Sequence, residues 1–198
     1  MNVVKVAGKT YGSMIAVLLA LPMGAAFLVW LADGSTRGGF DNAHIFSTRY
    51  IVSVLMLGVL LVPFFRYAQT RPVDATLTWG EAMVAAVYVF FVLFWAYGVV
   101  PHEFLNWADS ELAWRPDKKV IGPEGTWAQW WSFWKKIPLT IHKQIFRDLI
   151  AVLIYVYGLG GLIWAVAFWN DRAKKATEAA AVVKVSQYGR PLVAEAKN

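Results

Sequence analysis

The sequence predicts an all-α integral membrane protein with four transmembrane helices and a tryptophan-rich amphipathic helix that lies along the membrane surface. Hydrophobic residues make up 58% of the 198 residues and charged residues only 16%, which is far more apolar than ordinary globular usage. Four apolar stretches approach the roughly 20 helical residues that cross a bilayer. They cover about residues 12–32, 47–67, 80–100 and 147–169.

The first stretch resembles a signal peptide, because Lys5 and Lys9 precede it and small residues lie near Gly24. Its apolar length exceeds that of an ordinary signal sequence, so we expect a retained membrane anchor. The second stretch is short and reaches full length if Arg49 extends its charge toward the membrane surface. We expect the third to end at Pro101, since proline breaks helices.

A long interfacial loop, residues 101–146, separates the last two spans, and a basic soluble tail, residues 171–198, follows the transmembrane domain at 1–170. Within the loop, four tryptophans recur at i, i+3, i+4 and i+7, which is the stripe of one helix face. Thr126 and Gln129 form a capping-box pattern, so a helix is predicted over 126–137. Indole suits the headgroup level of a bilayer. We therefore expect contacts with lipid or a partner subunit from the loop aromatics Phe104, Trp107, Trp114, Trp127, Trp130, Trp131 and Trp134.

The basic residues favour an orientation with both termini in the cytoplasm, in a bacterial inner (cytoplasmic) membrane. Lysine and arginine divide almost evenly between the two sides, but those nearest the helix ends lie on the side of the termini, where the positive-inside bias is strongest. Of these, Arg172, Lys174 and Lys175 suit anionic lipid headgroups. The net charge of +6 thus indicates membrane surface or acidic partners, and no nucleic acid.

Several chemistries are excluded or disfavoured by composition. Cysteine is absent, which excludes disulfides, thiolate metal sites and covalent haem attachment. The predicted spans contain no histidine, and their ionisable residues lie only at their ends, at Glu81, Arg147 and Asp148. A haem held by this chain alone and an ion-coupled transport site are therefore disfavoured. We predict no catalytic residue and no cofactor of the chain's own.

Two candidate ligand sites remain as alternatives. His44, His102 and His142 fall on one membrane face in the predicted topology, with Glu103 adjacent, and could bind zinc, copper or iron; interfacial hydrogen bonding is the simpler explanation. The third span carries a bulky aromatic face that could line an apolar groove for quinone, lipid or pigment, or dock another subunit. Its members are Phe91, Phe94, Trp95 and Tyr97.

These observations favour a non-catalytic accessory subunit of a multi-subunit membrane complex, of the respiratory or photosynthetic electron-transfer kind. Such a subunit packs on a core subunit and docks a partner through its aromatic loop, so its partners are other membrane protein subunits and lipid. The alternatives are a metal-binding or redox subunit that uses the histidines, and a protein that binds quinone, lipid or pigment.

Overall fold

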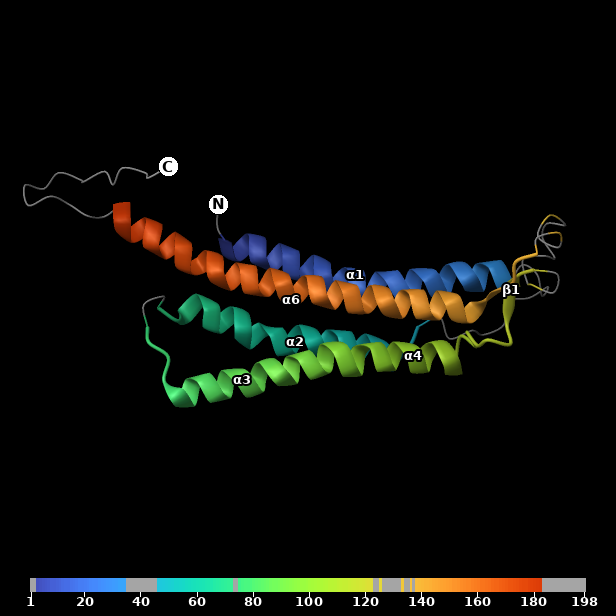
Figure 1. The fold of residues 1–198 in the computed structure, drawn as a ribbon, viewed down its shortest axis with the longest axis horizontal. Coiled ribbons are helices and arrows are strands. Elements are labelled where there is room, and N and C mark those ends of the chain that lie inside the picture. Colours follow the sequence, from blue (N-terminus) through green and yellow to red (C-terminus); the bar gives the residue numbers. More distant parts are fainter. Residues whose placement is uncertain are drawn as a thin grey trace, which may run out of the picture.

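The chain forms four long helical rods with a small folded loop at one end (Figure 1), in a computed structural model that describes residues 3–34, 46–72, 75–122, 125, 133, 136 and 138–182. The helices are α1 (Val3–Gly34), α2 (Thr48–Thr70), a third rod built from α3 (Trp79–Phe94), the π-helix η1 (Trp95–Val99) and α4 (Val100–Ser110), and α6 (Lys143–Val182). The start of α1 and the finish of α6 lie at the same end (Figure 1), here called the terminal end. The opposite end, which carries β1 (Lys119–Ile121) and β2 (Ile141–His142), is called the loop end.

The predicted set of four apolar helices long enough to cross a membrane is confirmed. The qualifying segments are Thr10–Leu31, Thr48–Thr70, Trp79–Ser110 and Lys143–Arg172. The third is longer than predicted, because the rod passes through Pro101 and ends at Ser110.

Pro101 does not end the third rod, contrary to the prediction, because a turn of π-helix precedes it. The Val100 backbone N–H donates to the carbonyl of Trp95, five residues back, so the helix is locally widened. Pro101 then occupies the first turn of α4, a position at which its missing N–H and fixed φ are tolerated. The rod therefore continues for three more turns and carries its aromatic residues into the fold.

The hydrophobic core lies toward the loop end, where α1, α2, α4 and α6 meet. Its centre is a set of rings: Tyr50 stacks on Trp107 at 6.0 Å between centroids and meets the edge of Phe104, also at 6.0 Å. Trp114 is buried at the same end. Burying large aromatic side chains is the strongest source of hydrophobic stabilisation available to so small a core.

Side-chain donors cross between helices to backbone carbonyls, and α2 takes part in each of these bonds. Tyr50 Oη donates to the Leu18 carbonyl at 2.6 Å. Because Pro22 has no N–H, this carbonyl lacks its ordinary helical donor, and the phenol supplies one. Trp95 Nε1 donates to the Ser53 carbonyl at 2.9 Å. Tyr11 and Tyr88 likewise donate to the carbonyls of Gly58 and Leu60.

Glycines mark the closest helix contacts, as small residues do in membrane bundles. A methyl group on Gly58 would lie 3.0 Å from the Tyr11 hydroxyl, and one on Gly161 would lie 2.7 Å from Met14 Cε. Gly158 leaves room for the Tyr97 ring, whose nearest atom would lie 3.5 Å from an added methyl group. The glycines of the fourth span thus let α1 and η1 approach α6.

The loop end is held by a short antiparallel strand pair that the sequence did not predict, in which Lys119 pairs with His142. The segment before β1 folds back on α4: the Trp114 backbone N–H donates to the Ala108 carbonyl at 2.8 Å, and the indole is buried. Of the helix predicted over 126–137, only Phe133 and Lys136 belong to the described residues. Trp127, Trp130, Trp131 and Trp134 lie outside them.

Candidate functional site

The outward face of α3 is the most exposed apolar surface in the described part of the chain. No residue of α3 is buried. Trp79 is 87% exposed and Phe90 72%, and these rings share the helix surface with Val84, Val87 and Phe94. In the third rod, therefore, the chain places bulky side chains where its own helices do not cover them.

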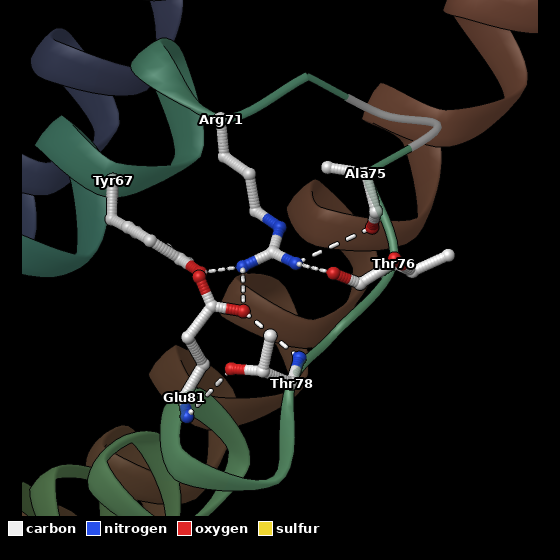
Figure 2. Close-up of polar contacts among 6 residues, drawn as sticks. All are labelled: Tyr67, Arg71, Ala75, Thr76, Thr78 and Glu81. Atoms are coloured by element: carbon white, nitrogen blue, oxygen red, sulfur yellow. Dashed lines mark hydrogen bonds and ion pairs between the residues drawn. The ribbon is translucent and has the colours of Figure 1, made fainter.

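A polar clip fixes the start of α3 to the end of α2 (Figure 2). Arg71 donates to the Tyr67 hydroxyl, to the carbonyls of Ala75 and Thr76 at 3.3 and 3.1 Å, and forms an ion pair with Glu81 at 3.6 Å. Glu81 also completes a capping box, in which its carboxylate accepts from the Thr78 backbone N–H at 3.0 Å. The Arg71 guanidinium thus connects the end of α2, the turn and the first turn of α3, and fixes where α3 begins relative to α2.

A second outward surface lies on α1, where small residues recur every fourth position. Gly12, Ala16, Ala20 and Gly24 are all exposed, and a methyl group added to Gly12 or Gly24 would meet no atom within 4 Å. Stripes of this spacing allow the backbone of a second membrane helix to approach closely. Within the described residues, no helix of this chain covers the stripe.

Three of the loop aromatics predicted to contact lipid or a partner lie inside the protein. Phe104 is fully buried, and Trp107 and Trp114 are only 2% and 1% exposed. The first two lie on the extension of α4, and the third is folded against the end of that helix. They pack against Tyr50 and α6, so their bulk stabilises the loop end and presents no surface to a neighbour.

The predicted aromatic groove beside the third span is not assembled from its four members. Phe91 and Phe94 are exposed on α3, whereas Trp95 turns to α2 through its bond to Ser53. Tyr97 stacks on Tyr155 of α6, with ring centroids 6.2 Å apart. Phe91 and Trp95 pack ring against ring with centroids 6.1 Å apart, so two of the four rings contact each other while Tyr97 faces another helix. An apolar groove of about 100 Å³ lies instead between α1 and α6, lined by residues of 17–22 and 153–157.

The candidate metal ligands are not brought together among the described residues. His102 is exposed on α4 beside Glu103, and His142 lies half-buried on β2. No group of three or more metal-binding side chains gathers within the described ranges. His44 lies outside them.

Sequence reasoning missed an ion-pair cluster that ties α4 to α6 at the loop end. Arg147 Nη1 lies 2.5 Å from Asp109 Oδ1, and Arg147 Nε lies 2.9 Å from Asp148 Oδ1. Arg147 and Asp148 were recognised only as charges at a span end. Asp109, the second partner of Arg147, is 38 residues away from it in sequence and carries no local signal of the pairing.

Arg172 and Lys174 lie on α6 at the terminal end, just after the apolar residues that finish at Trp169. The Arg172 guanidinium is placed over the Trp169 ring, with Cζ 5.0 Å from the centroid, and Lys174 is exposed. The side chain of Lys175 lies outside the described part of the structure.

Comparison of the chain with protein-family profiles, with curated proteins and with solved structures gives no match.

Proposed function

We propose that the protein is a non-catalytic accessory subunit of a multi-subunit membrane complex. The observation that carries this proposal is the outward face of α3, where Phe90 and Phe94 project and no residue is buried by the chain. Exposure to lipid costs such side chains nothing, since lipid tails are as apolar as leucine. The shape of the α3 surface, and not its hydrophobicity, is therefore what supports contact with another subunit.

Association of membrane helices depends on close packing, because lipid removes the hydrophobic drive between them. The α3 face offers protruding rings, and the α1 stripe from Gly12 to Gly24 offers a flat path for a helix backbone. The polar clip around Arg71 and the bonds from Tyr88 and Trp95 hold the third rod in a fixed position on α2. A fixed, protruding surface of this kind suits a permanent neighbour.

The loop end supplies a rigid base for a second contact outside the membrane. Trp107 and Trp114 anchor the start of the long loop, and the β1–β2 pair anchors its finish. We place the predicted tryptophan helix at 126–137 between these anchors, lying along the membrane surface or against a neighbouring subunit. Exposed Phe133 is consistent with that position.

We further propose a bacterial inner membrane, with both termini cytoplasmic, from the basic residues that flank the terminal end. Respiratory or photosynthetic electron transfer is the proposed context, because complexes of that class commonly contain small multispan subunits without ligands of their own. The absorption spectrum of the purified complex tests this part of the proposal directly.

The experiment is site-specific photocrosslinking in the native membrane, with benzoylphenylalanine placed at Phe90 of the tagged protein. The matched control is the same probe at Ile163, which is 61% exposed on α6. We expect a discrete protein adduct from position 90 that is stronger than any from position 163. Mass spectrometry of the adduct identifies the neighbour, and haem or pigment absorbance in the same native-gel band supports the electron-transfer context. Lipid adducts alone from position 90 would refute the proposal.

A further inference from the structure

The third rod contacts α2 on both sides of the π-helical turn η1. Before the turn, the Tyr88 hydroxyl donates to a backbone carbonyl of α2. At the first residue of the turn, Trp95 Nε1 donates to the Ser53 carbonyl at 2.9 Å. After the turn, Trp107 stacks on Tyr50 with 6.0 Å between the ring centroids. The same side of the rod therefore faces α2 in α3 and in α4 (Figure 1).

A regular α-helix would not present these three side chains to one neighbour. Trp95 follows Tyr88 by seven residues, which is close to two turns of about 3.6 residues, so both lie on the same face. Trp107 follows Tyr88 by 19 residues, whereas five α-helical turns take about 18. In an unbroken α-helix the Trp107 ring would thus lie about 100° around the rod from Tyr88, turned away from Tyr50.

The π-helical turn removes this mismatch. The Val100 backbone N–H donates to the carbonyl of Trp95, five residues back, where an α-helical bond spans four. The turn from Trp95 to Val99 therefore takes up one residue more than an α-helical turn does. With that residue absorbed, the rotation from Tyr88 to Trp107 is close to five full turns, and both side chains face α2.

The side of α3 that faces α2 also determines the side that faces outward. Tyr88 and Val92 are half-buried on the α2 side. Val87, Phe90 and Phe94 lie on the opposite side, and each is more than half exposed. If the whole rod were a regular α-helix with its α4 rings still buried, α3 would be turned by about 100° and would present a different set of side chains outward.

We infer that the third rod contains one surplus residue, which η1 absorbs, and that this turn thereby sets the outward face of α3. The inference concerns the orientation of a helix and does not depend on the proposed subunit role. It has a specific consequence for changes in chain length. Removing one residue at the turn leaves a regular helix with its α2 contacts aligned, whereas adding one creates a second surplus residue that the turn does not absorb.

The test is a spin-label scan of α3 in the full-length protein, reconstituted in phosphatidylcholine vesicles. The chain has no cysteine, so each label is attached to a single cysteine introduced at one of positions 83 to 94. Oxygen is more soluble in hydrocarbon than in water, so collision of the label with oxygen reports which side of α3 faces lipid. We expect the accessibility of the otherwise unchanged chain to be greatest at positions 87, 90 and 94 and lowest at 88 and 92.

Deletion of Gly98 should keep these maxima at the same positions, with a rotation far smaller than the roughly 100° of one residue. The deletion is also combined with Pro101→Ala, because a proline inside the shortened α-helix would lack its N–H and would disturb folding. Gly98→Ala is the matched control, since it keeps the residue count and its methyl group would lie 3.6 Å from the Phe94 ring, an ordinary contact. Neither Gly98→Ala nor Pro101→Ala alone should move the maxima.

Insertion of one alanine after Gly98 should either move the maxima by one position or lower the midpoint of detergent unfolding below that of the combined deletion variant. Rotation of about 100° on deletion would overturn the inference, because the face would then follow residue count in a regular helix. Rotation in Pro101→Ala would also overturn it by assigning the turn to the proline. An insertion that leaves both maxima and midpoint unchanged would show that contacts with α2 alone orient α3.

Discussion

Replacing Tyr50 by phenylalanine tests whether the phenol compensates for the proline in α1. The hydroxyl donates to the Leu18 carbonyl at 2.6 Å, and the Tyr50 side chain is fully buried. Pro22 cannot supply the ordinary helical donor to that carbonyl. Tyr50→Phe should therefore leave a carbonyl unsatisfied within the apolar span Thr10–Leu31.

The stability lost in Tyr50→Phe depends on whether another donor replaces the hydroxyl at the Leu18 carbonyl. Cross-helix hydrogen bonds in membranes average about 0.6 kcal/mol and reach about 1.7 kcal/mol, because a partner is commonly found elsewhere. Orphaned buried acceptors cost about 1–3 kcal/mol. Because Pro22 cannot supply the helical donor to Leu18, we expect the upper part of the membrane range to apply. We expect a loss of about 1–2 kcal/mol in the free energy of unfolding.

A double-mutant cycle with Pro22→Ala isolates this effect. An alanine at position 22 has an N–H that can donate to the Leu18 carbonyl, so Tyr50→Phe should then cost only about 0.5 kcal/mol, the net value of an ordinary bond. The assay is reversible unfolding in mixed micelles by titration with sodium dodecyl sulfate, followed by far-ultraviolet circular dichroism. An equal cost of Tyr50→Phe in both backgrounds would refute the link between Tyr50 and Pro22.

Three further pairs of substitutions test other contacts in the same unfolding assay. Gly161→Leu should cost about 1–3 kcal/mol because the side chain meets Met14 of α1, whereas Gly160→Leu faces open space and should cost little; equal effects would contradict the close approach of α1 and α6. Trp114→Ala should cost about 3–5 kcal/mol because the indole is buried at the loop end, while Trp79→Ala, at an 87% exposed position, should fall within about 0.5 kcal/mol. Arg71→Met removes the hydrogen bonds that the guanidinium donates and its ion pair with Glu81, and should destabilise more than Glu81→Gln, which removes the ion pair but retains a capping side chain; the reverse order would contradict the central role of the guanidinium.

The four spans could be predicted from sequence because the signal is local. A stretch of about 20 apolar residues can satisfy its backbone only as a helix once it is in lipid, whatever the neighbouring helices do. The prediction that the third span ends at Pro101 was wrong because it relied on a local rule that does not hold here. The rule that proline ends a helix assumes α-helical geometry, and the widened turn at Trp95–Val99 removes that assumption.

The placement of the loop tryptophans could not be read from composition. Indole suits a membrane surface and a buried core equally well, because both satisfy its apolar body. Trp107 and Trp114 are buried because the third rod continues through Pro101 as α4, which brings their side chains toward Tyr50 and α6. The Asp109–Arg147 ion pair depends on the same long-range arrangement. Prolines and tyrosines inside the spans did offer a signal for the phenol-to-carbonyl bonds, but pairing Tyr50 with Leu18 requires the topology.

The two ends of the bundle are stabilised differently, and this difference separates folding from recognition. At the loop end, rings from α2 and α4 are buried together with Trp114, so substitutions there act on the stability of the chain itself. Toward the terminal end the third rod is held on α2 by the Tyr88 bond and the Arg71 clip, and its outer face stays uncovered. Loss of the exposed Phe90 ring should therefore leave unfolding nearly unchanged while altering contacts with neighbours. The surface that the chain does not need for its own fold is the one available for recognition.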